Sequence, residues 1–270
     1  MSRTVVLGAN GMLGYAVRSY FSRKGDTVVA LGRGEFDIAC EPMSKLEGLL
    51  GDADRVINCA GVIKPRIAEM RVEDVLKVNS IFPRNLARLC NRLEIPLYHV
   101  TTDCVYTGND GGYTEESYFD ADDVYGLTKN AGDAADCMVL RTSIIGEEQG
   151  PSRSLLEWAR SQSGKQVNGF VNHRWNGVTT VHLAEIIERI ESDGLYASGI
   201  HHVHSPDTVN KAELLEILDA VYELGLTIQP VDAASGCDRS MASVLPLSAT
   251  VATKSIRQQV EEMRAFFADS

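Results

Sequence analysis

The chain has 270 residues, and with 44% of them hydrophobic it can build the packed core of one large domain or two small ones. Its 37 acidic residues outnumber its 26 basic ones, for a net charge of -11, which argues against nucleic acid as a partner. No apolar stretch reaches the length of about 18 residues that spans a membrane, and the start does not resemble a signal peptide. We therefore expect a cytoplasmic protein with no membrane partner.

The six cysteines are scattered and include no C-x-x-C pair, which favours reduced thiols over disulfides or zinc. Three histidines, His201, His202 and His204, fall in a segment that reads as a strand, and we predict no metal site there. An acidic protein binds an anionic small molecule locally, through backbone N–H groups, helix N-termini and a few placed cations.

Short apolar runs alternate with helical segments through the first half of the chain. We predict strands over residues 3–7, 27–31, 55–59, 96–101 and 137–141. We predict helices over residues 15–24, 43–50 and 72–92, and another within 121–136. This alternation predicts an α/β fold with a doubly wound parallel sheet of Rossmann type, whose ligands bind at the carboxyl ends of the strands.

The alternation loosens past Gly146. The later segments lie at 154–163, 181–192, 199–204 and 210–222, with a final helix near 254–267. We predict a dinucleotide-binding Rossmann domain over 1–146. Residues 147–270 are expected to form mainly a smaller substrate-binding lobe, partly interleaved with the sheet.

A glycine-rich turn with the spacing G-x-x-G-x-x-G follows the first strand. Gly8 permits the tight turn, Gly11 lets the backbone approach a pyrophosphate, and Gly14 lets the helix pack close to the strand. The flanking strand and helix make this turn a predicted dinucleotide site. Its contacts are assigned to Gly8, Asn10, Gly11, Met12, Leu13 and Gly14.

Tyr125 and Lys129 form a Y-x-x-x-K pair on one face of a predicted helix. Reducing a ketone with a nicotinamide hydride requires a proton donor at the carbonyl oxygen. A phenol, with a pKa of about 10, is a poor donor near neutral pH unless a cation lowers that pKa. Lys129 can supply this cation. Taken alone, the spacing also fits an ordinary surface pair.

Two more motifs close predicted strands: residues 101–106 close the fourth and residues 58–61 the third. With the glycine turn and the Tyr125–Lys129 pair, they resemble an extended short-chain dehydrogenase/reductase over essentially the whole chain. Within that superfamily the chain is similar to the dTDP-4-dehydrorhamnose reductase group and related reductases of nucleotide-linked 4-keto-6-deoxysugars. Supporting segments lie at 112–115, 141–143, 175–180 and 199–203.

The resemblance implies a role for particular residues. Lys129 would also hold the nicotinamide ribose, and Thr102 would hydrogen-bond the substrate oxygen. The implied catalytic set is Thr102, Tyr125, Lys129 and Cys104. The implied further cofactor contacts are Asp37, Ile38, Cys59, Ala60, Gly61, Tyr125 and Lys129. The candidate substrate contacts are Lys64, Thr102, Asp103, Cys104, Trp175 and Arg239, of which Lys64 and Arg239 would meet a diphosphate.

The cofactor choice depends on the end of the second strand. NAD-preferring relatives usually carry an acid there, whereas this chain offers Arg33, a cation suited to a 2′-phosphate. We expect NADPH, with NADH as the alternative. The expected partner is a nucleotide-diphosphate sugar, and a homodimer stays open.

Three functions compete. The leading one is reduction of a nucleotide-diphosphate 4-keto-6-deoxysugar in surface glycan or glycosylated-metabolite biosynthesis. The second is an epimerase-reductase, because GDP-fucose synthase also places a cysteine two residues after its catalytic hydroxyl, as Cys104 follows Thr102; that family's partner histidine has no match here. The third is a non-catalytic regulatory subunit that binds nucleotides. Dehydration is disfavoured, because Cys104 stands where the 4,6-dehydratases carry glutamate.

Overall fold

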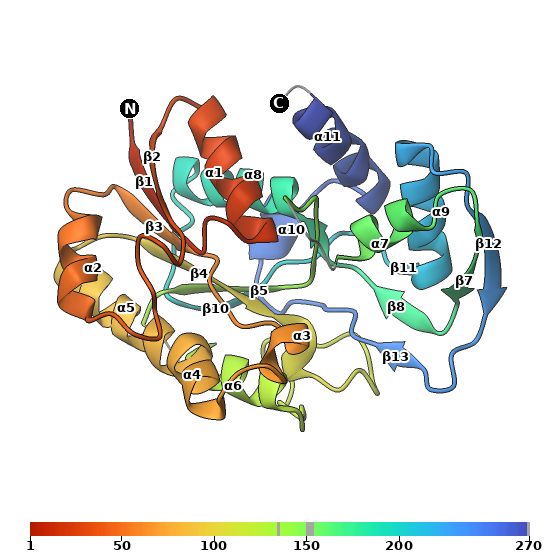
Figure 1. Cartoon of the computed structure of the whole chain (residues 1–270), viewed down its shortest axis with the longest axis horizontal. Helices are drawn as coiled ribbons and strands as arrows, with labels where there is room; N and C mark the ends of the chain where they lie inside the picture. Colours follow the sequence, from red (N-terminus) through yellow and green to blue (C-terminus); the bar gives the residue numbers. More distant parts are fainter. Residues whose placement is uncertain (134–135, 150–153, 269–270) are drawn as a thin grey trace.

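A six-stranded parallel sheet forms the centre of the computed structural model, which describes residues 1–133, 136–149 and 154–268 (Figure 1). From edge to edge its strands are β10 (Gly199–His202), β5 (Met138–Thr142), β4 (Leu97–Thr102), β3 (Arg55–Asn58), β1 (Arg3–Leu7) and β2 (Thr27–Leu31). All neighbouring pairs run parallel. The predicted doubly wound α/β sheet is thus confirmed.

Helices cover both faces of this sheet, which explains why its inner strands are apolar almost throughout. Val6 of β1 belongs to the core under one layer, and its neighbours Val5 and Leu7 belong to the core under the other. One layer consists of α1 (Met12–Arg23), α8 (Thr180–Ser192) and α11 (Ile256–Ala268). The other contains α2 (Met43–Leu50), α5 (Phe82–Arg92) and α6 (Val124–Asp133).

The helix predicted over 72–92 contains a π-helical turn. Its parts are α4 (Val72–Leu76), the π turn η1 (Lys77–Ile81) and α5. Pro83 has no N–H to donate to the carbonyl of Asn79, which favours such an irregularity. A Cβ added at Gly132 of α6 would clash with that carbonyl oxygen. Helix α6 therefore packs directly against the π turn.

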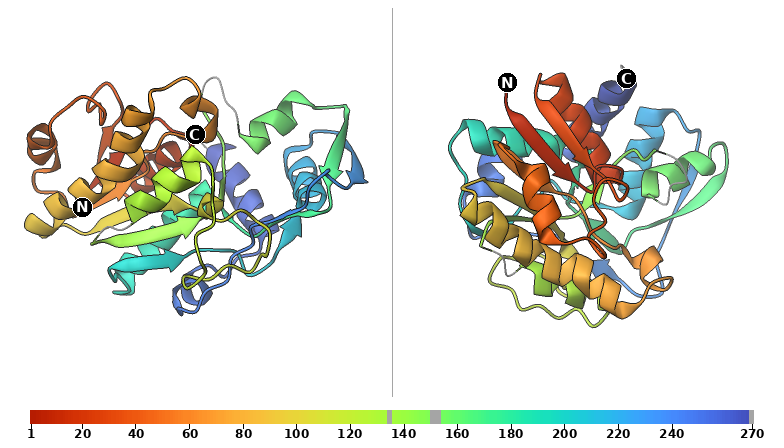
Figure 2. Two further views of the ribbon diagram at one scale, coloured as in Figure 1. Left: turned by 90° about the horizontal axis from the view of Figure 1, so that it is seen from below. Right: turned by 60° about the vertical axis from the view of Figure 1, so that its left-hand side comes forward.

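Both halves of the chain contribute to the central unit, since β10, α8 and α11 all follow residue 146. The other later elements gather at one end of the molecule (Figure 2). They are α7 (Leu155–Ser161), β7 (Gln166–Phe170), β8 (His173–Trp175), β11 (Val209–Asn210), α9 (Lys211–Tyr222), β12 (Thr227–Val231) and β13 (Cys237–Asp238). The domain boundary at residue 146 stays a prediction.

The remaining elements are short. They are α3 (Lys64–Ile67), the 3-10 turn η2 (Asp103–Val105), β6 (Ile144–Ile145), β9 (Val178–Thr179) and α10 (Leu247–Val251). Within the described residues, no helix combines the length and the apolar character needed to cross a membrane. In the same part of the chain, no three histidine, cysteine or acidic side chains gather as a metal site.

Candidate active site

The glycine turn joins β1 to α1 and lies against the loop that follows β3. Gly8 has a φ of 71°, and a Cβ there would come within 2.7 Å of the Ala60 backbone. A Cβ at Gly14 would come within 2.8 Å of the Ala9 Cα. Any larger residue at Gly8 or Gly14 would push this turn away from its neighbours.

Helix α1 begins at Met12, with Gly11 as its N-cap. No side chain caps this end, and the first turn holds no acidic residue. Its backbone N–H groups are therefore available to an anion, and the helix dipole favours negative charge there. Asn10 is exposed beside the turn, whereas Leu13 is buried in the core.

The loop after β2 carries both an acid and a cation. Arg33 is exposed, as the cofactor prediction requires. Glu35, which was not predicted, accepts a hydrogen bond at Oε2 from the backbone N–H of Gly32 at 2.9 Å. Gly32 in turn adjoins the Asn10 side chain. An acid at this strand end accepts hydrogen bonds from ribose hydroxyls and repels a 2′-phosphate, so Glu35 opposes the effect expected of Arg33.

Asp37 and Ile38 continue this loop. Asp37 Oδ1 accepts a hydrogen bond from the Ala39 backbone N–H at 3.0 Å, and the Asp37 N–H donates to the Glu41 carboxylate at 2.9 Å. Ile38 packs against the apolar cluster on the α2 side of the sheet. Their contact with an adenosine stays a prediction.

The loop of residues 59–61 is held from both sides by buried amides. Asn58 Oδ1 accepts from the Ala60 N–H at 3.1 Å. Asn79 of the π turn bonds both backbone groups of Val62: its Oδ1 accepts from the N–H at 2.8 Å, and its Nδ2 donates to the carbonyl at 3.1 Å. Asn79 was not predicted, because nothing in a helical segment marks an asparagine that serves a distant loop.

Helix α6 presents Tyr125 to the end of β4. A Cβ at Gly126 would lie 2.5 Å from the Cys104 carbonyl oxygen, so this glycine allows the helix to touch the turn that follows β4. Burial raises the pKa of Tyr125, and Cys104 raises it further, whereas a hydrogen bond with the Thr102 hydroxyl lowers it. Thr102 and Tyr125 therefore meet at this point, as the predicted site requires.

Lys129 lies one helical turn farther along α6 and is only 5% exposed. Its Nζ is 3.4 Å from the Val100 carbonyl oxygen and 3.7 Å from the position of a Cβ at Gly61. Burial lowers the pKa of Lys129, while Asp133 and Cys59 raise it. The group that lowers the pKa of Tyr125 here is Thr102, and the expected effect of Lys129 on the phenol stays a prediction.

The turn after β4 holds Thr102, Asp103 and Cys104 together. Thr102 Oγ1 accepts from the Cys104 N–H and donates to Asp103 Oδ1, each at 3.1 Å. Burial, and then Asp103, raise the pKa of the Cys104 thiol to about 11, although Arg239 lowers it. The thiol is therefore protonated at neutral pH.

Two cations lie near Asp103: Arg239, which was predicted, and Lys211, which was not. Arg239 donates from Nε to the Tyr106 carbonyl at 2.8 Å and lowers the pKa of Asp103, which burial raises. Lys211 lies at the start of α9. Burial lowers its pKa and Asp103 raises it. Its Nζ lies 5.9 Å from the Trp175 ring centroid.

Lys64 and Trp175 have protein partners of their own. Lys64 forms a 2.6 Å ion pair with Asp123, and its Nζ lies 5.8 Å from the Tyr125 ring centroid. Trp175 is 7% exposed, and its indole N–H donates to Ser143 Oγ at 2.8 Å. Lys64 thus lies beside the Tyr125 ring, whereas Trp175 packs mainly in the core; their contacts with substrate stay predictions.

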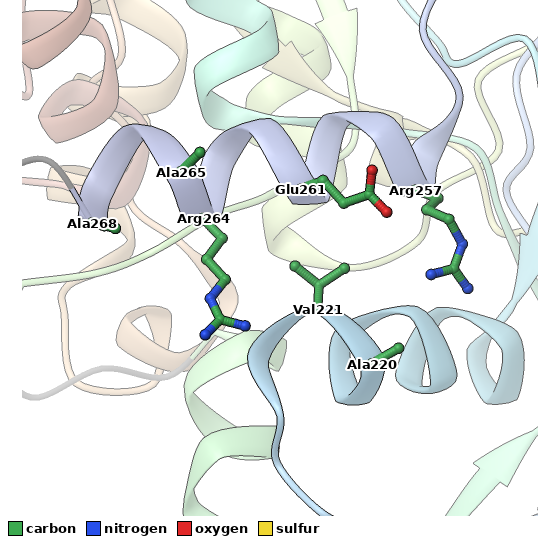
Figure 3. A pocket seen from close by; sticks show the side chains of 7 residues that line it. All are labelled: Ala220, Val221, Arg257, Glu261, Arg264, Ala265 and Ala268. Carbon is green, nitrogen blue, oxygen red and sulfur yellow. The ribbon is translucent and has the colours of Figure 1, made fainter.

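A cavity of about 440 Å³ lies elsewhere, between α9 and α11, where Ala220 and Val221 face Arg257, Glu261 and Arg264 (Figure 3). A second cavity, of about 360 Å³, shares Arg264 with it. No predicted site residue lines either one. Both cavities are therefore separate from the candidate active site.

The chain is similar to several known reductases. It is 33% identical over 155 residues to a dTDP-4-dehydrorhamnose reductase of Mycolicibacterium smegmatis, a match that covers 53% of this chain and 46% of that protein. It is 28% identical to a probable low-salt glycan biosynthesis reductase of Haloferax volcanii, over 88% of this chain and 86% of that one. The chain spans about half the length of each mycobacterial and Streptomyces griseus dTDP-4-dehydrorhamnose reductase that it matches.

A solved structure supports the same fold. The dTDP-4-dehydrorhamnose reductase of Bacillus anthracis, solved in complex with NADP, superposes over the full length of both chains with a TM-score of 0.82 at 19% identity. Residues 2–269 match the family described as the RmlD substrate binding domain, which confirms the resemblance drawn from the sequence. This chain therefore belongs to the RmlD substrate binding domain family.

Proposed function

We propose that this protein is an NADPH-dependent reductase of a nucleotide-diphosphate-linked 4-keto-6-deoxysugar in glycan or glycosylated-metabolite biosynthesis. One observation carries the proposal: the Tyr125 phenol and the Thr102 hydroxyl meet at the carboxyl end of β4, with Lys129 buried one helical turn away. The names of the relatives support it, because they include reductases of dTDP-linked ketosugars and a glycan biosynthesis reductase.

The residues around the glycine turn fit a dinucleotide. The close approach of Gly8 to Ala60 leaves room for backbone only, and the uncapped end of α1 offers N–H donors to a pyrophosphate. Gly61 keeps the space beside the Lys129 ammonium free of a side chain. These residues would hold the phosphates and the nicotinamide ribose. When bound, a reduced nicotinamide supplies the hydride.

The chain's own groups provide the proton and the orientation. Tyr125 donates its phenolic proton to the ketone oxygen as negative charge develops there. Thr102 turns its hydroxyl proton from Asp103 Oδ1 to the same oxygen and so fixes the carbonyl. The buried Lys129 ammonium stabilises the phenolate that is left on Tyr125. A ketone becomes an alcohol, and no water molecule is gained or lost.

A nucleotide-diphosphate sugar suits the cations that lie around Asp103 and Tyr125. Arg239 and Lys211 both act on Asp103, and Lys64 lies over the Tyr125 ring. We assign the diphosphate to this group of cations. Reversible ion pairing of Lys64 with Asp123 leaves that lysine able to exchange partners when an anion arrives.

We infer NADPH as the preferred cofactor, with NADH as an alternative. The exposed Arg33 supports NADPH, and a bacterial structural neighbour is described with NADP. Glu35, bonded to the same loop, supports some use of NADH. Another neighbour is described with NAD.

The buried thiol argues against the epimerase-reductase alternative. Exchange of a proton beside the carbonyl needs a thiolate, and a pKa of about 11 leaves Cys104 protonated near neutral pH. We therefore assign Cys104 to the lining of the sugar pocket.

The experiment that tests this proposal follows NADPH absorbance while the purified protein meets dTDP-, UDP- and GDP-linked 4-keto-6-deoxysugars. Oxidation of NADPH with at least one of them, lost in Tyr125→Phe, is the expected result. A protein that binds NADPH and nucleotide sugar but reduces none of the panel would be a regulatory subunit, and the proposal would fail.

We also propose a homodimer formed through α4, η1 and α6. Five apolar side chains are exposed on these adjacent elements: Val72, Leu76, Ile81, Val124 and Leu127. Exposed apolar groups gathered in this way favour burial against a second surface. Leu127→Glu should shift the sedimentation of a dimer to that of a monomer; a monomeric wild type would contradict the proposal.

A further inference from the structure

A buried ion pair lies directly behind the Tyr125–Lys129 pair. Tyr125, Lys129 and Asp133 follow one another at four-residue spacing on α6, so their side chains form one stripe along the helix. Asp133 is 2% exposed and Arg141 of β5 is fully buried. Asp133 Oδ2 and Arg141 Nη2 are 2.8 Å apart. Two charged groups at this depth need an explanation, because such pairs contribute little net stability.

Arg141 is fixed in place by groups from other elements. Its Nη1 lies 3.1 Å from the Tyr106 hydroxyl and 3.4 Å from His202 Nε2. Burial lowers the pKa of His202, and its Nδ1 lies 2.9 Å from the Ala242 carbonyl oxygen, so Nδ1 carries the proton and Nε2 accepts. The guanidinium also stands 4.6 Å from the Phe119 ring centroid. Arg141 cannot turn away from Asp133 without breaking these contacts.

Asp133 is only partly satisfied by Arg141. Among the residues that the structure describes, its Oδ1 has no hydrogen-bond partner of good geometry, although it is buried. Its charge acts on both members of the catalytic pair, raising the pKa of Lys129 and that of Tyr125. Burial raises the pKa of Asp133 above its ordinary value, and two cations, Arg141 and Lys129, both act to lower it.

We propose that Asp133, clamped by Arg141, is a positioning residue that balances the charge of the Tyr125–Lys129 pair and keeps Lys129 an ammonium ion. The proposal rests on the proposed reductase function. Without Asp133, the two buried cations Lys129 and Arg141 would repel each other, because no anion would lie between them. Without Arg141, Asp133 would retain Lys129 as its cationic neighbour on α6.

The other titratable groups that face Lys129 do not replace this anion. Cys59, at the end of β3, has a pKa raised by burial, so its thiol is neutral. His99 of β4 has a pKa lowered well below its ordinary value, first by burial and then by Lys129, so it too is neutral. Tyr125 is a neutral phenol because burial raises its pKa. Among the described residues, Asp133 is thus the carboxylate that raises the pKa of Lys129, whereas Asp103, at the turn after β4, raises the pKa of Tyr125 alone.

The test compares the pH dependence of kcat in two variants whose shifts are predicted to have opposite sign. Asp133→Asn removes a negative charge, which lowers the pKa values of both Lys129 and Tyr125. The alkaline limb of the kcat profile, where kcat falls as the pH rises, should therefore move to lower pH by about 1 unit. Arg141→Gln adds net negative charge, and the limb should move up by about as much. Arg141→Lys restores the charge and should return the limb to the wild-type position.

Arg55→Gln is the matched control for loss of stability. Arg55 is another buried arginine, 5% exposed, which pairs with Asp26 and Glu191 at the far side of the sheet. It should lower Tm and leave the alkaline limb unmoved. If Asp133→Asn does not fold, the comparison of Arg141→Gln with Arg141→Lys carries the same test with the opposite sign.

A second measurement separates this proposal from the reductase assignment. Labelled-lysine NMR follows the titration of Lys129 directly, with its signal assigned by loss in Lys129→Met. The titration should move down in Asp133→Asn and up in Arg141→Gln even if no ketosugar is reduced. Equal titration curves, or shifts of the same sign in both variants, would overturn the proposal.

Discussion

Replacing Gly126 by alanine should separate Tyr125 from Thr102 without altering either side chain. The added Cβ would lie 2.4 Å from the Ala121 Cβ and 2.5 Å from the Cys104 carbonyl oxygen, whereas ordinary contact begins at 3.4 Å. The start of α6 must therefore move away from the turn after β4 by about 0.9 Å. A displacement near 1 Å at reacting groups lowers turnover on the order of 10²-fold, because the phenol proton no longer points at the carbonyl oxygen within hydrogen-bond distance.

The assay compares kcat, the dissociation constant of NADPH and Tm for Gly126→Ala and for a matched variant, Gly48→Ala. Gly48 also lies within a helix, and a Cβ there meets nothing within 4 Å. Gly48→Ala should keep kcat and raise the unfolding free energy by up to about 1 kcal/mol, since alanine is the better helix former. NADPH binding should not change in Gly48→Ala. In Gly126→Ala the contacts at the glycine turn stay in place, so the loss should be larger in kcat than in NADPH binding.

Wild-type turnover in Gly126→Ala would refute the placement of Tyr125 against the Thr102–Cys104 turn. A loss of turnover matched by an equal loss of folded protein would refute it as well, since the effect would then come from stability alone.

Three further predictions concern cofactor choice, Cys104 and acid stability. Arg33→Ala should narrow the preference for NADPH over NADH by about tenfold, and Glu35→Gln should widen it; unchanged ratios of the dissociation constants would remove these side chains from the site. Turnover in deuterated water should place no enzyme-dependent, non-exchangeable deuterium beside the reduced carbon; label that disappears in Cys104→Ser while reduction continues would establish epimerisation. Hydrogen bonds from His182 and then Lys254 lower the pKa of Glu185 to about 2, so Glu185→Gln should lower Tm at neutral pH. That difference should shrink as the pH falls from about 4.5 to about 2, and a constant difference would contradict it.

Much of the central sheet could be predicted because its signals are local. The first two strands begin and end at the predicted residues, Arg3–Leu7 and Thr27–Leu31, since apolar runs there are bounded by glycine or polar residues. The first helix begins earlier than predicted, at Met12, because residues of the glycine turn form its first turn. The π turn was not predicted: Pro83 favours an irregularity there, but the approach of Gly132 of α6 to the Asn79 carbonyl depends on packing between distant elements.

The site divides in the same way. Tyr125 and Lys129 could be predicted because residues four apart on a helix lie side by side. No local sequence pattern marks the residues that were not predicted. Asn79 bonds Val62, Lys211 acts on Asp103, and Glu35 accepts from Gly32 across a turn. Their roles follow only from packing between elements.

The central claim is that hydride reaches the keto carbon of a nucleotide-linked sugar while Tyr125 supplies the proton. The most direct measurement uses NADPH with deuterium at the transferable position, followed by mass spectrometry and NMR of the sugar product. One deuterium bound to the former carbonyl carbon, formed by the wild type and on the order of 10² times more slowly by Tyr125→Phe, is the predicted result. Unlabelled product, label at another carbon, or an undiminished rate in Tyr125→Phe would contradict it.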